Sequence, residues 1–310
     1  MPLDHAIARF LADSPPDQAD ASLAELRNAT DTALLWQQGK PTSLVHNEAF
    51  TFPAADGYPV AVRVYVPVGL ENSIGRPAMV FAHGGGWCLG SLPAWESPCR
   101  QLAEATGCVI LSVGYRLAPE HKFPVPLEDV YSALCWITQQ ASALGLNPQR
   151  ISIGGDSAGG NLAAAACLLA RDRAGPRIHH QLLLYPALGA ALNTPSSHRY
   201  AQGYGLTRDV MFFCWQNYLR DADDAANPYA SPAMAVSLAG LPPATILVSE
   251  YDPLRDEGEH YAKRLKEEST AVRFVQLDGM IHGCMHMTGI TPAAEEVFAT
   301  LQPSAFGSDQ

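Results

Sequence analysis

The sequence predicts an α/β fold with a mostly parallel central sheet flanked by helices. From about residue 77 to residue 301, short apolar stretches of strand character alternate with helical stretches, and this order is typical of parallel strands joined by helices. The chain has 310 residues, of which 47% are hydrophobic and 16% charged. That is enough for a large core, so we expect one α/β domain with an accessory piece.

The first 43 residues read as two helical pieces that precede the first strand signal. Ser14-Pro15-Pro16 separates the two pieces, and the second ends near Gly39-Lys40-Pro41. Proline and glycine interrupt helices, which is why these positions set the expected boundaries.

Residues 48–54 and 59–67 alternate apolar and polar side chains on either side of Asp56-Gly57. This pattern predicts a hairpin or an adjacent antiparallel pair of strands. Further strands are expected at 77–83, 108–114, 150–155, 179–187, 244–250 and 272–278. Helices are expected at 95–106, at 126–143, after Ser157, at 256–268 and at 292–301.

Residues 188–225 interrupt the alternation of strands and helices. Small and polar residues come first, and residues 207–219 then form an amphipathic helical pattern rich in aromatic side chains. The aromatic stripe of this helix consists of Phe212, Phe213, Trp215 and Tyr218. Aromatic residues at helical spacing are more often core than ligand contacts, so we interpret the stripe as core.

The charge and the composition exclude several classes of partner. The net charge is −11 with 20 Lys and Arg residues, and no basic cluster is visible, so nucleic acid and anionic membrane surfaces are poor partners. The N-terminus has no continuous apolar core and no run reaches transmembrane length, which argues against a secretory signal and against membrane insertion. The seven cysteines are scattered and include no C-x-x-C pair. We therefore expect reduced thiols in a cytoplasmic protein.

One tight turn marks the expected nucleophile. Gly155-Asp156-Ser157-Ala158-Gly159 follows a strand-like stretch and precedes a helical stretch rich in Ala and Leu. Such a reversal lifts the Ser157 hydroxyl off the sheet and places it at the positive end of the helix, while the flanking glycines avoid collisions with neighbouring backbone. The alternative is a glycine-rich connection in an ordinary α/β unit. Asp156 is expected to point away from the serine and to be structural.

A glycine loop is expected to supply hydrogen-bond donors for the oxyanion of an acyl-transfer reaction. The run H-G-G-G-W at 83–87 directly follows an expected strand, and three successive glycines allow backbone N–H groups to face a cavity. The N–H group of Ala158, the residue after the nucleophile, is a further donor. The alternative is a flexible loop without this role.

The acid of the same site is expected later in the chain, at the end of a strand. Asp252 stands just beyond the apolar stretch 244–250, and Pro253 ends that strand. Asp256 and Glu257 are rival carboxylates. Both fall in the first turn of the next expected helix, where capping and the helix dipole explain them without catalysis.

The base is expected last. His282 stands in the permissive stretch G-M-I-H-G at 279–283, beyond the last expected strand, and fits best among the ten histidines. His286, four residues on, is the rival. No histidine belongs to an H-E-x-x-H motif or to a Cys/His cluster, so neither a metal ion nor another cofactor is expected.

With these segments in place, the chain resembles the hormone-sensitive-lipase-like carboxylesterases of the α/β-hydrolase superfamily, also called family IV of the bacterial lipolytic enzymes. The matching motifs are HGGGW at 83–87, YRLAPEHKFPVPLED at 115–129, GDSAGG at 155–160, YPAL at 185–188, SPAMA at 231–235, DPLRDEGE at 252–259 and MIHGC at 280–284. Together they extend over most of the chain and are highly specific.

The resemblance implies an α/β-hydrolase fold and a set of site residues. The implied triad and oxyanion donors are Ser157, Asp252 and His282, and the backbone N–H groups of Gly85, Gly86 and Ala158. The resemblance also implies a helical cap over the site. The expected domains are the N-terminal cap helices at 1–43, the first part of the catalytic core at 44–187, the cap insertion at 188–225 and the second part of the core at 226–310.

Further expectations concern the surroundings of the glycine loop. In similar proteins the histidine at position 83 holds that loop by hydrogen bonds, so its implied role is structural. Tyr115-Arg116 and Glu128-Asp129 are expected to brace the same region as a buried polar network. Cys284 is a departure, because similar sequences often carry an aromatic residue there, and the smaller side chain is expected to enlarge the acyl pocket slightly.

The expected reaction is hydrolysis of short- to medium-chain acyl esters through an acyl-enzyme formed on Ser157. A cap without a strongly apolar lid helix favours small-molecule esters over emulsified fat. The alternatives are an amidase, a specialised lactone- or drug-type esterase, and a non-catalytic small-molecule binder of the same fold. The chain is expected to be a monomer or a homodimer, for example one paired through an edge strand such as 272–278.

Overall fold

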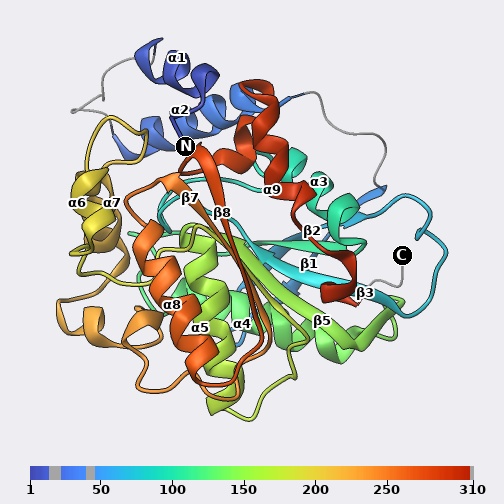
Figure 1. Ribbon diagram of the computed structural model, residues 1–310. Helices are drawn as coiled ribbons and strands as arrows, with labels where there is room; N and C mark the ends of the chain where they lie inside the picture. The colour runs from blue at the N-terminus through green and yellow to red at the C-terminus, as the bar shows by residue number, and fades with distance from the viewer. Residues whose placement is uncertain (14–21, 40–45, 308–310) are drawn as a thin grey trace.

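The computed structural model describes residues 1–13, 22–39 and 46–307, and within them it forms one eight-stranded sheet (Figure 1). The strands are β1 (His46–Pro53), β2 (Pro59–Val66), β3 (Arg76–Ala82), β4 (Val109–Gly114), β5 (Leu146–Asp156), β6 (Gln181–Leu184), β7 (Ala244–Tyr251) and β8 (Val272–Ile281). Their order in the sheet is β1-β2-β4-β3-β5-β6-β7-β8. β2 pairs antiparallel with β1 and β4, and all other neighbours are parallel. The predicted α/β class with a mostly parallel sheet is confirmed.

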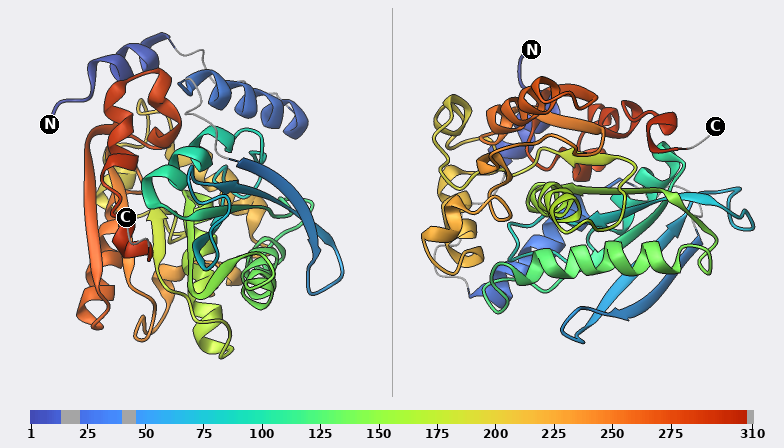
Figure 2. Two further views of the ribbon diagram at one scale, coloured as in Figure 1. Left: turned by 90° about the vertical axis from the view of Figure 1, so that its right-hand side faces the viewer. Right: turned by 90° about the horizontal axis from the view of Figure 1, so that it is seen from below.

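Helices cover both faces of the sheet (Figure 2). They are α1 (His5–Asp13), α2 (Leu23–Gln37), α3 (Glu96–Thr106), α4 (Val125–Gln140), α5 (Ala158–Asp172), α6 (Pro195–Arg199), α7 (Arg208–Tyr218), α8 (Arg255–Glu267) and α9 (Glu296–Ala299). The 3-10 helices are η1 (Asp223–Ala226), η2 (Pro232–Met234), η3 (Cys284–Gly289), η4 (Pro292–Glu295) and η5 (Pro303–Phe306). α4, α5 and α8 contribute to one buried apolar cluster, and α3 and α9 to a second. Burial from both sides explains why all four residues of β6 are buried.

β1 and β2 form the predicted antiparallel pair. Their connection closes with two backbone hydrogen bonds of 2.8 Å, from Gly57 N–H to Ala54 O and from Ala54 N–H to Tyr58 O. Gly57 has a φ of 84°, a conformation that glycine adopts without steric cost. The hairpin prediction is therefore confirmed, including the position of Gly57 in the turn.

Two elements near the C-terminal end differ from the prediction. β8 continues to Ile281, because extra residues around Gly279, whose φ is 73°, form a bulge opposite β7. Part of the stretch expected as a loop is therefore strand. The helix predicted at 292–301 consists of η4 and the single turn α9. Gln302 is extended, as the residue before a proline prefers, so Pro303 opposes continuation of the helix.

The N-terminal helices lie over the end of the sheet at which β8 finishes, and α6 and α7 lie along one side (Figure 1). The backbone N–H of Asp4 donates to the carbonyl oxygen of Gly279 at 3.1 Å, which fixes α1 to the end of β8. α2 ends at Gln37, close to the expected boundary at Gly39. The expected break at 14–16 lies outside the described residues, as do positions 40 and 41.

Two further findings concern the chain as a whole. Within the described ranges, no helix combines the length and the apolar character needed to cross a bilayer. All seven cysteines are free thiols, and all are buried except Cys135, which is partly exposed. The thiols thus agree with the interpretation of the cysteines as reduced.

Candidate active site

Ser157 occupies the turn between β5 and α5 in a strained backbone conformation. Its φ is 53° and its ψ is −118°, a combination that few residues other than glycine adopt. The flanking glycines make the turn possible: a β carbon on Gly155 would overlap the carbonyl group of Gly159, and a β carbon on Gly159 would overlap the carbonyl group of Ala82. The strand, the turn and the helix predicted around Ser157 are all present.

Three of the expected site residues meet in one hydrogen-bonded chain. Oγ of Ser157 lies 2.8 Å from Nε2 of His282, and Nδ1 of His282 lies 2.7 Å from Oδ2 of Asp252. Asp252 is fully buried, and its Oδ1 accepts the backbone N–H of Leu254 at 2.8 Å. A carboxylate only accepts hydrogen bonds, so Nδ1 carries the imidazole proton and Nε2 is free to accept the serine proton. The fold thus joins residues that lie 30 and 125 positions from His282 in the chain.

The glycine loop, residues 83–87, lies beside the serine turn. Gly84 donates its backbone N–H to Oδ1 of Asp156 at 2.8 Å. Gly85 and Gly86 have φ angles of 100° and 58°. Their N–H groups, like that of Ala158, donate no hydrogen bond within the part of the chain that the structure describes. Such amides are available to a negatively charged oxygen that forms next to the serine.

Helix α7 packs on the last residue of the glycine loop. The ring of Trp87 stacks on Tyr218 at 4.4 Å between centroids and lies 4.3 Å from the ring of Trp215. The predicted core role is therefore confirmed for Trp215 and Tyr218, which are buried. It is wrong for Phe213, which is 43% exposed, because α7 lies at the surface and only one face of it packs inward.

His83 holds the glycine loop from behind. Its Nδ1 lies 2.8 Å from the carbonyl oxygen of Gly84, and its ring stacks on Tyr115 at 4.4 Å between centroids. The hydroxyl of Tyr115 donates to the carbonyl oxygen of His83 at 2.8 Å. Burial lowers the pKa of His83 to about 4, so the ring is neutral at pH 7. These contacts agree with a structural role for His83.

The polar network expected around Arg116 is smaller than predicted. Asp129 is fully buried and receives three hydrogen bonds from Arg116, at 2.9 Å from the backbone N–H and at 2.9 and 2.6 Å from the guanidinium. Glu128 does not take part, because its position on α4 turns it outward to a pair with Arg173 at 2.6 Å. The sequence neighbours Glu128 and Asp129 therefore have different roles.

The rival carboxylates have a role that the sequence did not indicate. Both lie in the first turn of α8, as predicted, but neither occupies its N-cap position, which is Leu254. Oδ2 of Asp256 accepts the backbone N–H of Ser196 at 2.7 Å, and Oε1 of Glu257 accepts that of Leu188 at 2.9 Å. Both carboxylates hold the loop after β6 against α8. Burial, with a smaller effect of the charge on Asp252, raises the pKa of Glu257 to about 8.

The rival histidine also lies apart from the triad. Nδ1 of His286 is 3.0 Å from Nε2 of Gln38, the residue that follows α2. His286 is buried, and burial lowers its pKa to about 3. It makes no hydrogen bond to Ser157 or Asp252 among the described residues, so the geometry favours His282 as the base.

Asp156 is the main residue whose partners sequence reasoning missed. Its Oδ1 accepts N–H groups from Gly84 and from the Trp95 indole, both at 2.8 Å. Burial raises the pKa of Asp156 to about 6, although these two hydrogen bonds oppose the shift. The partners lie 72 and 61 positions away in the chain, so only the glycine at position 84 gave any signal of a close backbone approach.

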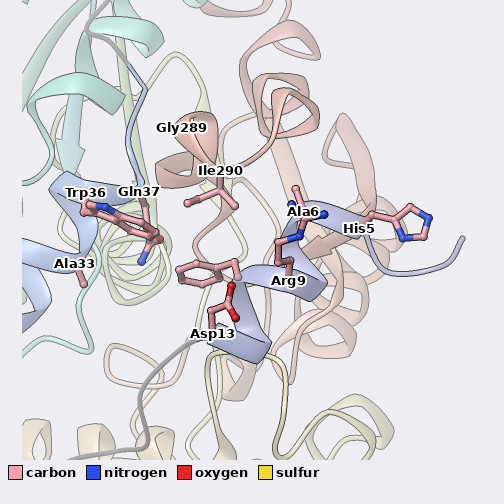
Figure 3. A pocket seen from close by; sticks show the side chains of 10 residues that line it. His5, Ala6, Arg9, Asp13, Ala33, Trp36, Gln37, Gly289 and Ile290 are labelled. Atoms are coloured by element: carbon pink, nitrogen blue, oxygen red, sulfur yellow. The ribbon is translucent and has the colours of Figure 1, made fainter.

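One cavity of the described structure lies away from the triad, between α1 and α2. It has a volume of about 720 Å³ and is lined by Arg9, Phe10, Trp36 and Ile290, among others (Figure 3). None of the three triad residues lines it. In the described ranges, no group of three or more His, Cys, Asp and Glu side chains is placed to hold a metal ion.

The chain is similar to known ester hydrolases in both sequence and structure. A family model described as the alpha/beta hydrolase fold matches residues 79–286. The chain is 47% identical over 218 residues to carboxylic ester hydrolase LipN of Mycobacterium tuberculosis, covering 68% of this chain and 58% of that protein. It is 36% identical over 244 residues to ethyl acetate hydrolase of Pseudomonas putida, covering 78% and 76%. A hyperthermophilic esterase from Pyrobaculum calidifontis is similar in structure, with a TM-score of 0.91, 37% identity, and coverage of 99% and 98%.

Proposed function

The chain belongs to the hormone-sensitive-lipase-like carboxylesterases of the α/β-hydrolase superfamily, and from this premise we propose that it hydrolyses esters of short- and medium-chain acids with Ser157 as the nucleophile. One observation carries the proposal, the continuous chain of hydrogen bonds from Ser157 through both ring nitrogens of His282 to Asp252. A hydroxyl becomes a usable nucleophile when an adjacent base takes its proton and a third group holds that base.

The reaction has two halves. Oγ of Ser157 attacks the ester carbonyl while Nε2 of His282 takes the hydroxyl proton, and Asp252 remains ionised and stabilises the imidazolium. The tetrahedral intermediate then collapses, the alcohol leaves with the proton from Nε2, and the acyl group stays on Ser157. In the second half, His282 takes a proton from water, which attacks the acyl carbon, and Ser157 regains its proton as the acid leaves.

The oxyanion is stabilised by the backbone N–H groups of Gly85, Gly86 and Ala158 in this proposal. Each such donor lowers the barrier by roughly 3 kcal/mol in comparable sites. The positive φ angles of Gly85 and Gly86 support the assignment, because they turn successive amides in directions that a regular strand or helix does not allow.

The proposal divides the chain into a core and a cap. The core comprises 44–187 and 226–310, and the cap comprises 1–43 and 188–225. Contacts of α2 and α7 support this division. The guanidinium of Arg27 on α2 donates to the carbonyl oxygens of Cys88 and Ala118 at 2.8 and 3.1 Å, and α7 packs on Trp87. α2 thus contacts the residue that follows the glycine loop, and α7 covers the last residue of the loop.

Small esters fit this site better than long ones. Ser157 is only 7% exposed, and α7 packs on the last residue of the glycine loop beside it. The similar protein from Pseudomonas putida is named for its action on ethyl acetate, which supports a small acyl group here as well.

The proposal also covers the assembly and the compartment. We infer a monomer or a homodimer that acts in the cytoplasm, because seven free thiols suit a reducing environment. β8 is an edge strand of the sheet, so it is the place where a second copy could pair. Light scattering after size exclusion distinguishes the two states.

Two measurements test the proposed function. The protein is assayed on 4-nitrophenyl esters from acetate to palmitate and on the matching anilides, and we expect the highest kcat/KM between acetate and octanoate. Faster cleavage of the anilides would instead assign an amidase, and a preference for long-chain esters above their solubility limit would assign a lipase. Mass spectrometry of a phosphonate adduct is expected to find the label on Ser157, and full activity of Ser157→Ala would contradict the proposal.

A further inference from the structure

The glycine loop is held from behind by a carboxylate that no step of the reaction uses. Oδ1 of Asp156, a residue that is 2% exposed, accepts both the backbone N–H of Gly84 and Nε1–H of Trp95 at 2.8 Å. Gly84 directly precedes Gly85 and Gly86. The position of the Gly84 peptide group therefore determines where the backbone that carries the N–H groups of Gly85 and Gly86 starts.

Trp95 connects this carboxylate to a second group of contacts. The ring of His286 stands edge-on to the Trp95 indole, with 4.7 Å between centroids and an angle of 84° between planes. Nε2 of Gln38 lies 2.7 Å from the carbonyl oxygen of Ala94 and 3.0 Å from Nδ1 of His286. A carbonyl oxygen only accepts, so Gln38 turns its NH₂ group toward both partners and uses both hydrogens.

Gln38 belongs to the proposed cap, because it is the C-cap residue that directly follows α2. The next residue, Gly39, donates its N–H to Oγ1 of Thr288 at 3.1 Å. The end of α2 therefore rests on η3, the turn that follows His282, and on the segment that carries Trp95. A displacement of α2 would break both hydrogen bonds of Gln38 and leave a buried carbonyl group and a buried ring nitrogen without a donor.

We propose that Asp156 and Trp95 are positioning residues that keep the glycine loop in the conformation that stabilises the oxyanion. Through the contacts of Gln38, the conformation of this loop also depends on the position of α2. The inference rests on the proposed function, since it gives the N–H groups of Gly85 and Gly86 their role in the reaction. It adds that the N-terminal part of the cap acts on the chemical step as well as covering the site.

The effect is expected in kcat. Oxyanion donors act mainly in the transition state, so a misplaced loop lowers kcat and leaves KM nearly unchanged. Misplacement of reacting groups by about 1 Å can cost about 10²-fold in rate. We expect that loss for Asp156→Leu, a loss of about 10-fold for Trp95→Phe, and a loss of about 3-fold for Gln38→Leu, in order of distance from the loop.

The first experiment measures kcat, KM and the melting temperature of these variants with 4-nitrophenyl acetate. Asp156→Asn keeps an oxygen for Gly84 and Trp95 and is expected to recover most of the activity that Asp156→Leu loses. Equal losses in Asn and Leu variants would overturn the positioning role, because the charge and not the acceptor would then matter. A fall in melting temperature alone, or a change in KM alone, would overturn it as well.

The second experiment is a double-mutant cycle between Gln38→Leu and Trp95→Phe. If Gln38 acts through Trp95, the double variant is no slower than Trp95→Phe, whereas independent effects multiply and would overturn the connection to α2. Gln37→Leu and Trp136→Phe are matched controls with expected wild-type kcat. Gln37 lines the cavity between α1 and α2 (Figure 3), and Trp136 packs on Phe50 and Phe52.

Failure of this inference is distinguishable from failure of the proposed function. The function is tested by the loss of activity in Ser157→Ala, measured on the protein with all positioning residues intact. The inference is tested by the ratios of kcat between variants that retain Ser157, His282 and Asp252. Unchanged kcat in Gln38→Leu and Trp95→Phe would overturn the inference and leave the assignment of Ser157 as it stands.

Discussion

Gly86 of the glycine loop lies against Cys214 of helix α7, so that a β carbon on Gly86 would overlap both Sγ and Cβ of Cys214. Cys214 is only 3% exposed, and because protein interiors are close-packed, its side chain cannot shift without disturbing its neighbours. The loop that carries the proposed oxyanion donors therefore packs directly on a helix of the proposed cap. Any atom added between them must displace one of the two.

A first prediction follows for Gly86→Ala. The added β carbon is expected to shift the loop and to lower kcat with 4-nitrophenyl acetate about 10²-fold, as the loss of an oxyanion donor does. Cys214→Gly removes the overlapping atoms, so the double variant is expected to recover part of the lost rate, with Cys214→Gly alone as the control. If the double variant is as slow as Gly86→Ala, the φ of 58° at Gly86, and not the overlap, causes the loss.

A second prediction concerns the triad. Ser157→Ala and His282→Ala are each expected to lower kcat by about 10⁴-fold or more, and the double variant is expected to be no slower than either, since the two groups act as one unit. Asp252→Asn is expected to cost about 10⁴-fold, because the amide favours the wrong imidazole tautomer. Steady-state kinetics with far-UV circular dichroism as a folding control checks this. Losses that multiply between Ser157 and His282 would contradict a shared step.

A third prediction concerns pH and Glu257, whose pKa of about 8 in the folded protein lies above the ordinary glutamate pKa of 4.5. Between these values the folded protein binds more protons than the unfolded chain, so this group lowers the free energy of unfolding as pH rises from about 4.5 to 8. Glu257→Gln keeps an acceptor for Leu188 and removes the titration. Relative to the wild type, its melting temperature is expected to rise by several degrees between pH 5 and pH 9, and a constant difference would refute the prediction.

A fourth prediction compares two neighbouring carboxylates. Asp129→Ala leaves the guanidinium of Arg116, whose side chain is 10% exposed, without its buried partner, and is expected to destabilise the protein by about 3–5 kcal/mol. Glu128→Ala removes a pair whose side chains are 32% and 44% exposed and is expected to cost less than about 1 kcal/mol. Urea unfolding measures the loss of stability in both variants. Similar losses would contradict the prediction, because the difference in burial between the two ion pairs would then not affect their contribution to stability.

The predictable part of the fold has a local physical basis. The hairpin followed from alternation around Asp56-Gly57, and the parallel sheet from the order of strand and helix signals. The predictions failed where a distant contact decided the outcome. The register shift opposite β7 extended β8 through Gly279, and packing of only one face of α7 left Phe213 exposed.

The sequence by itself determined the serine turn and the glycine loop, because their backbone conformations are possible only with glycine at set positions, as at Gly155 and Gly86. Chain order then pointed to Asp252 and His282. Only the tertiary structure decided which partner each of the other polar residues has. Asp156, Glu257 and Gln38 meet partners that lie 72, 69 and 248 positions away. A buried polar group must find a hydrogen bond, but its own sequence neighbourhood does not say where the fold will supply one.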